Sequence, residues 1–297
     1  MSNTRQILQR RKAVRNIGRV TRTMEMISTS RYRKHYYAWN DSMGFFDSLA
    51  QLAYLVITAN EPIAHPLMEE KESDSMAVLV IGSDRGLCGS YNANIFRLLN
   101  VHISRAKRLK KKLKIYAYGR KVESYLKSHG ISIEKVYDDF EEVPSEEQVV
   151  SIGEDFCGQY ERGEICYFGV VYTRFYSMAS QREQTLTVLP LSELIDDLTT
   201  RATVIWPWEL AFEDFSLSPS AVEIFRSLAD MMIRSSILGC FRDAALSEHL
   251  ARVVAMRSAT ENSEKMIDEL TGEYNRARQS QITGELMDII GGAEALR

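Results

Sequence analysis

The sequence predicts an α/β protein with long helices, in which the two ends of the chain pair as an antiparallel coiled coil and the middle forms a small, mostly parallel α/β domain. All six prolines of the 297-residue chain lie between residues 62 and 219. Proline costs a helix interior about 3 kcal/mol, so both proline-free ends permit long helices. We expect an N-terminal coiled-coil helix at 1–60, the α/β domain at 75–205 and a C-terminal coiled-coil helix at 216–297.

The first helix is predicted from a seven-residue apolar repeat. Ten of the sixteen core positions between residues 7 and 59 are apolar, and such a repeat keeps one stripe against a partner helix. One line of core positions contains Ile7, Val14, Leu49 and Val56, and the other contains Ile17, Met24, Ala38, Phe45, Leu52 and Ala59. Most of the polar positions cluster at Thr21, Ser28, Arg31, His35 and Ser42, where we expect the seam to face something other than a dry core.

The second helix carries a similar stripe, which drifts by one residue along its length. Its apolar positions are Ile224, Leu228, Met231 and Leu238, and then Ile267, Leu270, Tyr274 and Ala277. Ser220 follows Pro219 and suits a helix start, and Gly291–Gly292 is the expected stop. Antiparallel pairing of the two ends is the simplest arrangement that covers both stripes.

The middle of the chain alternates short apolar runs with helix patterns. Strands are expected at 77–82, 114–119, 164–173 and 185–191, and helices at 91–105, from about 120 to His129, and at 146–161. Buried parallel strands read as short continuous apolar runs. The alternation therefore predicts a small, doubly wound, Rossmann-like sheet.

A glycine-containing turn, GSDRGLCGSYN (82–92), follows the first strand. Glycines at a strand-to-helix turn can cradle a phosphate. This turn spells neither GxGxxG nor GxxxxGK[ST]. A tight turn, with the next helix capped by Ser90 or Asn92, is therefore favoured over nucleotide binding.

The residues that carry chemistry are scattered. The four cysteines include no CxxC pair, the five histidines (His35, His65, His102, His129, His249) show no HExxH spacing, and Ser83-Asp84 has no evident histidine partner. Asp138, Asp139, Glu141 and Glu142 can bind a cation but lack EF-hand spacing, so an acidic loop is favoured. No window approaches the ~20 apolar residues of a membrane-spanning helix. We therefore predict no active site, cofactor or metal on this chain.

Charge is unevenly placed along the chain. Residues 1–40 contain ten lysines and arginines and one acid, Glu25, whereas the whole chain has a net charge of −3. A basic arm on an acidic body suggests an acidic partner, either nucleic acid or a protein surface. Tyr32, Tyr36, Tyr37 and Trp39 lie among the basic residues, a pattern that can bind single strands. A shaft that docks on acidic protein fits equally well, so both interpretations stay open.

Three segments resemble the gamma subunit of F-type ATP synthases. They are RNIGRVTRTMEMISTSRYRK (15–34), IGSDRGLCGSYNANI (81–95), and residues 247–296, which match the family's C-terminal helix along nearly its whole length. The resemblance implies a non-catalytic rotor whose paired terminal helices turn inside a ring of alpha and beta subunits. It also implies an α/β domain beside the epsilon subunit on the membrane c ring. Ion flow through that ring would then drive ATP synthesis on the beta subunits.

The resemblance also implies particular contact residues. Met24, Arg22, Arg252, Arg278, Gln279 and Thr283 occupy positions that contact the beta subunit in this family. Phe215, Leu217 and Ser218 belong to the loop that meets the c ring in this family, and FSLSP (215–219) departs from the family's aromatic-x-aromatic-Glu-Pro pattern. The first signature begins close to Met1, which favours a bacterial chain held peripherally at the cytoplasmic face of the plasma membrane. A nucleic-acid-binding protein that uses the basic N-terminal helix is the alternative.

Overall fold

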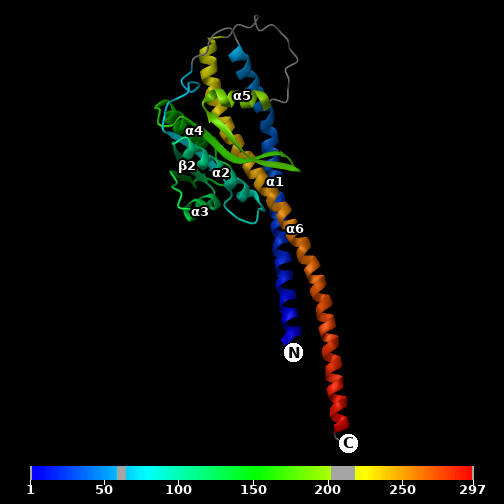
Figure 1. Cartoon of the computed structure of the whole chain (residues 1–297). Helices are drawn as coiled ribbons and strands as arrows, with labels where there is room; N and C mark the ends of the chain where they lie inside the picture. The colour runs from blue at the N-terminus through cyan, green and yellow to red at the C-terminus, as the bar shows by residue number, and fades with distance from the viewer. Residues whose placement is uncertain (1, 59–64, 202–217, 296–297) are drawn as a thin grey trace. The chain divides into compact units, whose positions relative to one another are not determined.

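The structure is a computed structural model that describes residues 2–58, 65–201 and 218–295 (Figure 1). Two long helices, α1 (Ser2–Thr58) and α6 (Ala221–Ala295), bracket an α/β region in the chain. The chain divides into two compact units, residues 1–30 with 252–297, and residues 31–251. Each unit therefore contains part of both long helices.

In the first unit α1 and α6 pack against each other in antiparallel order. Thr4 Oγ1 bonds to Gln281 Oε1, an Arg11 nitrogen approaches Thr271 Oγ1, and Thr21 Oγ1 lies 2.8 Å from Thr260 Oγ1. The residue numbers of the contacting pairs rise along α1 as they fall along α6, so the predicted antiparallel pairing of the chain's two ends is confirmed.

The buried seam of α1 differs from the prediction. Thr21 and Ser28 are buried with Val14 in the first unit, and Ser42 is buried in the second. The expectation that the polar positions avoid a dry core is therefore wrong at these three, whereas it holds at Arg31 and His35, which contact Glu142. The physical reason is visible for two of the hydroxyls, since Thr21 donates to the carbonyl of Gly18 and Ser42 to that of Trp39. Such small side chains satisfy their polar atoms on their own helix and still pack closely.

The second line of predicted core positions faces outward instead. Ile17 is 54% exposed, and Phe45 and Leu52 are each 48% exposed. In the second unit the first line continues through buried Leu49 and Val56. One of the two apolar lines of α1 is thus buried within the chain, and much of the other is left on the surface.

The second unit contains a five-stranded sheet in the order β3-β2-β1-β4-β5. The strands are β1 (Ser75–Ile81), β2 (Lys112–Tyr118), β3 (Lys135–Tyr137), β4 (Phe168–Ser177) and β5 (Ser180–Leu189). β1 pairs in parallel with β2 and β4, β2 pairs in parallel with β3, and only the β4–β5 pair is antiparallel. The mostly parallel sheet is as predicted, although β3 was not expected.

Helices cover both faces of this sheet. They are α2 (Tyr91–Arg108), α3 (Arg120–Ser128), α4 (Glu146–Glu161) and α5 (Leu191–Arg201), together with the first part of α6. Val78 and Val80 of β1 face α2 and α3, where they join Ile95 and Val122 in one core. Alternate β1 residues face a second core, whose members include Phe156 of α4, Phe225 and Phe241 of α6, and Leu49 of α1. The period of two in β1 thus sends its side chains into two separate cores.

The start of α6 is as predicted, whereas its end and the cap of α2 differ from the prediction. Ser220 Oγ accepts from the backbone N–H of Glu223, which makes it the expected cap of α6. At the other end, α6 continues through Gly291–Gly292 to Ala295, so the glycine pair does not stop it. Ser90 precedes α2 but makes no side-chain capping bond, and the side chain of Asn92 turns back to Ser83 instead.

The edges of the sheet are protected by length and charge. β3 at one edge is three residues long, and β5 at the other carries Arg182 and Glu183. Glu183 forms an ion pair with Arg97 of α2 at 3.5 Å. Short or charged edge strands discourage pairing with the strands of other chains.

Candidate functional site

The predicted partner-contact residues of α1 lie on a side that α6 partly covers. Arg22 is exposed and forms an ion pair with Glu264 at 2.5 Å, and Met24 is half-buried. Glu25, one residue along, accepts from Arg257 at 3.2 Å. Exposed ion pairs contribute only about 0–1 kcal/mol each, so Arg22 can exchange Glu264 for an acidic partner at little cost.

Three predicted contact residues of α6 are exposed and close together. Arg278, Gln279 and Thr283 are on the surface, and the Thr283 hydroxyl donates to the carbonyl of Gln279 at 2.9 Å. Gln279 and Thr283 are four residues apart and therefore share one helix face. Among the described residues of this unit, no other helix covers these polar side chains.

Arg252 lies elsewhere on the same helix. It precedes Gln279 by 27 residues, about 40 Å at 1.5 Å per residue. It is only 7% exposed and has interactions within the chain. The structure therefore brings Gln279 and Thr283 together and places Arg252 at a separate level. Among the predicted foot residues, Ser218 is exposed immediately before α6, whereas Phe215 and Leu217 lie outside the described residues.

Large apolar side chains are exposed along both helices of the first unit. On α1 they include Ile17, Val20, Met26 and Ile27, and on α6 they include Val254, Ile282, Leu286, Met287, Ile289 and Ile290. Contiguous apolar surface on a soluble protein marks an interaction site. The helix pair therefore offers a partner both apolar contacts and the polar group around Gln279.

The glycine loop after β1 closes on itself. Asn92 accepts from the backbone N–H of Ser83 and donates to its hydroxyl, which in turn donates to the carbonyl of Arg85. Asp84 accepts from the backbone N–H of Arg120. A Cβ on Gly82 would lie 2.3 Å from a methyl group of Val122, so this glycine serves close packing. These contacts support the tight-turn interpretation over a phosphate cradle.

The acidic group divides into two parts. Asp138, Asp139 and Glu141 are exposed, as an acidic loop should be. Glu142 instead contacts Arg31, His35 and His249. Burial opposes ionisation of Glu142, but the two histidines and Arg31 outweigh it and hold the pKa of this carboxyl well below its usual value.

Sequence reasoning missed this meeting of two histidines and a glutamate because they are more than a hundred residues apart along the chain. The antiparallel pairing of the two helices was the signal that could have placed these histidines near each other. Thr21 pairs with Thr260, and moving 14 residues up α1 to His35 means moving about as far down α6, close to His249. An explicit alignment of the two predicted helices would have placed these histidines opposite each other.

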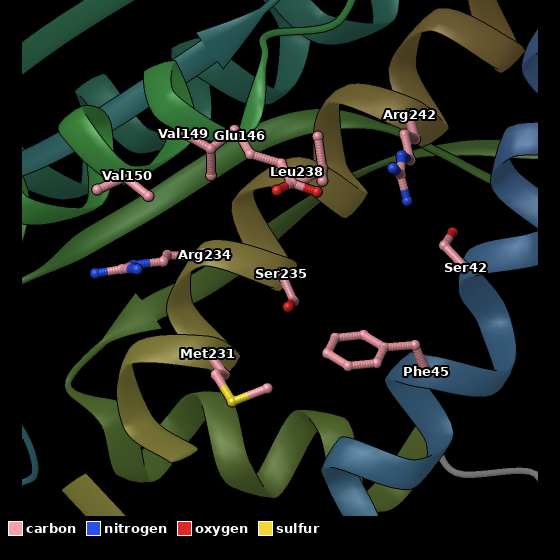
Figure 2. A pocket seen from close by; sticks show the side chains of 10 residues that line it. All are labelled: Ser42, Phe45, Glu146, Val149, Val150, Met231, Arg234, Ser235, Leu238 and Arg242. Atoms are coloured by element: carbon pink, nitrogen blue, oxygen red, sulfur yellow. The ribbon is translucent and has the colours of Figure 1, made fainter. Parts of the chain in front are cut away.

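A cavity of about 410 Å³ lies between α1, α4 and α6 in the second unit. Figure 2 shows Phe45 of α1 pointing toward Ser235 and Met231 of α6, with Glu146 and Val149 of α4 beyond. The ionisable side chains that line it are Glu146, Arg234 and Arg242, and burial lowers the pKa of Arg242. This set can bind an ion or an apolar group but supplies no nucleophile with a neighbouring base.

The contents of the two units define a class of protein, one with an antiparallel pair of long helices and a doubly wound α/β domain. A family model described as ATP synthase matches residues 3–296. The ATP synthase gamma chain of Rhodopirellula baltica is 37% identical over 100% of this chain and 99% of its own, and that of Trichormus variabilis is 33% identical over all of both chains. The chain belongs to the ATP synthase gamma chain family.

Solved structures support the same fold. A chain of the Euglena gracilis mitochondrial ATP synthase rotor matches with a TM-score of 0.65 at 18% identity, covering 95% of this chain and 99% of that one. A chain of the Tetrahymena thermophila central stalk and c ring matches with a TM-score of 0.54 at 16% identity, covering 81% and 99%. Within the described residues, no helix has the length and apolar character needed to cross a membrane.

Proposed function

We propose that this chain is the central-stalk rotor subunit of a rotary ATP synthase. It couples ion flow through a membrane c ring to ATP synthesis and hydrolysis on catalytic beta subunits, and is itself non-catalytic. Family membership supports this role. The structural observation that carries it is the paired terminal helices, which leave large apolar side chains on their outer surface.

The helix pair suits the transmission of torque because its two helices are joined at several levels. The Thr21–Thr260 contact lies inside the seam, and the Arg22–Glu264 and Arg257–Glu25 ion pairs lie beside it. Gly18 brings the backbones close, since a Cβ there would lie 3.3 Å from Ser263 Cβ. Relative sliding of the helices would break these contacts together, so the pair resists shear.

The surface of the pair suits a surrounding ring of alpha and beta subunits. Arg278, Gln279 and Thr283 form one polar contact group for beta, and Met24 and Arg22 form another. Charged and polar donors of this kind make strong hydrogen bonds to acidic loops. Arg252 is assigned to beta as well, on the family resemblance alone, since it is buried within this chain.

The α/β domain is assigned to the foot of the rotor. There it would lie beside the epsilon subunit and on the c ring, with Phe215, Leu217 and Ser218 in the contacting loop. The chain would then meet the membrane only peripherally, through the complex, at the cytoplasmic face of a bacterial plasma membrane.

Co-assembly tests this function. The full chain is mixed with the alpha and beta subunits of the same organism, and the complex is isolated and assayed for ATP hydrolysis. A single gamma chain is expected to enter each complex and turn when a bead on the foot is followed by microscopy. A complex that excludes the chain, or that turns over ATP with the chain stationary, would refute the rotor role.

The nucleic-acid alternative is tested with the same protein. Phosphate contacts would make affinity for single-stranded DNA fall steeply with salt. Part of the basic arm is already engaged in the helix pair, because Arg22 bonds Glu264 and the Arg11 guanidinium lies 5.4 Å from the centre of the Tyr274 ring. We therefore expect weak binding to DNA that does not compete with assembly.

A further inference from the structure

Three side chains from three separate elements converge in the second unit. His35 of α1, His249 of α6 and Glu142 of the loop before α4 have potential ligand atoms that all lie within 4.8 Å of one another. His35 Nε2 lies 2.7 Å from Glu142 Oε2, and His249 Nε2 lies 3.2 Å from Oε1. The two imidazole rings are stacked, with centroids 5.2 Å apart and planes 15° apart.

His249 is the unexplained member of this group. It is 4% exposed, and neither of its ring nitrogens has a partner in hydrogen-bonding geometry. A buried polar group without a partner costs about 1–3 kcal/mol. Its Nε2 nevertheless lies 3.2 Å from an oxygen of the same carboxylate that His35 contacts. A neutral imidazole with no hydrogen bond, buried beside a carboxylate, is able to bind a metal ion through its ring nitrogen.

We propose that His35, Glu142 and His249 form a binding site for a Zn²⁺-like transition-metal ion. Two imidazole nitrogens and one carboxylate oxygen are a donor set that zinc takes, with a fourth position for water. The side chain of Glu142 is 29% exposed and that of His35 12% exposed, so an ion and its water can enter from the side of the carboxylate. The left-handed backbone of Glu142, with φ of +49°, turns this side chain toward the histidines.

Arg31 gives the proposal its sharpest test. Its guanidinium contacts Glu142 Oε1, so it neutralises the carboxylate and adds a positive charge beside the metal position. If the cluster is only an ion-pair network, Arg31 is a stabilising member. If the cluster binds a cation, Arg31 is an antagonist, and its removal strengthens metal binding.

The bound ion would connect three elements that pack in this unit. α1, α6 and the loop before α4 each supply one ligand, so metal binding would tie the α/β region to both long helices within residues 31–251. This inference does not depend on the rotor role, because it concerns the isolated chain.

The experiment uses the full chain, stripped of metal with EDTA and titrated with Co²⁺ as a spectroscopic probe, followed by displacement with Zn²⁺. We expect one equivalent of Co²⁺ with a visible d–d absorption band of a site with nitrogen and oxygen ligands. His249→Gln, His35→Gln and Glu142→Gln should each weaken binding by more than about 10-fold. Arg31→Gln should strengthen it, and His129→Gln, which alters an exposed histidine, should leave it unchanged.

The outcomes separate cleanly. Absence of the band in a folded chain at neutral pH would overturn the proposal, as would an intense near-ultraviolet thiolate band, which would assign the metal to cysteines. Unchanged binding in His35→Gln would do the same, and this variant is informative even if His249→Gln fails to fold, because His35 is nearer the surface. Weaker binding in Arg31→Gln would also contradict the assignment.

Discussion

The Thr21–Thr260 contact is a hydrogen bond buried inside the helix pair, and its removal has a calculable outcome. Both residues are buried and their hydroxyl oxygens lie 2.8 Å apart. Thr21 can also donate to the carbonyl of Gly18 at 3.1 Å, and Thr260 to that of Met256 at 2.9 Å. The two hydroxyls have two hydrogens for three possible bonds, so when one hydrogen crosses between the helices the other bonds the carbonyl of its own helix.

Valine replaces the hydroxyl of threonine with a methyl group of similar size. In Thr21→Val the remaining hydroxyl of Thr260 turns to its own carbonyl, and in Thr260→Val the converse occurs. Each single change therefore loses one net hydrogen bond, about 1 kcal/mol, without leaving a buried donor unpaired. The double change removes both hydroxyl hydrogens and so both bonds, and should cost about 2 kcal/mol, the sum of the two single changes.

The assay is urea unfolding of the full chain followed by far-ultraviolet circular dichroism, with hydrogen exchange of the peptides around both positions to localise the effect. Thr23→Val is the matched control, since Thr23 is an exposed threonine that bonds only to the carbonyl of Arg19, and it should change the free energy of unfolding by less than about 0.5 kcal/mol. A loss in either single variant no larger than that of Thr23→Val would refute a buried hydrogen bond at this level of the helix pair.

Three other variants test the domain and the proposed surface. Gly119 has φ of +94°, and a Cβ there would lie 2.7 Å from a main-chain carbonyl oxygen, so Gly119→Ala should lower the free energy of unfolding in urea by at least about 2 kcal/mol. Gly130 has φ of +65° with open space around it, so Gly130→Ala should lower it by about 1 kcal/mol. Burial lowers the pKa of His102, so its contribution is present above pH ~6.5 and is lost as pH falls; melting temperatures of His102→Gln should therefore fall less between pH 7 and 5 than those of the parent chain. Gln279→Glu should reduce ATP-driven rotation of the assembled complex more than Asp138→Lys, and equal effects would remove Gln279 from the contact surface.

The sequence predicted the helix pair because its signal, proline-free apolar periodicity, extends over many turns. It expected both apolar lines to be buried, although much of the second is exposed. It also misjudged Thr21 and Ser42, which count as polar in a pattern but satisfy their hydroxyls on their own helix. β3 escaped prediction because three residues, Lys135–Tyr137, are too short to show a period.

The residues of the candidate site differ in the signal that they leave in the sequence. Arg278, Gln279 and Thr283 came from family resemblance, since an exposed polar helix face has no signature of its own. The group around Glu142 depends on the spatial pairing of two distant helices, which composition and local spacing do not encode. The tight turn after β1 was predictable, because the missing lysine of a phosphate loop is a local feature.

The protected edge strands of the sheet have a consequence for how this chain binds other molecules. β3 has only three residues and β5 carries charged side chains, so neither edge strand readily pairs with a strand of another chain, the step at which amyloid-like growth begins. Binding to other proteins is therefore left to the helix surfaces, where individual side chains determine which partner fits. The sheet edges thus limit aggregation, and the helices provide selective binding.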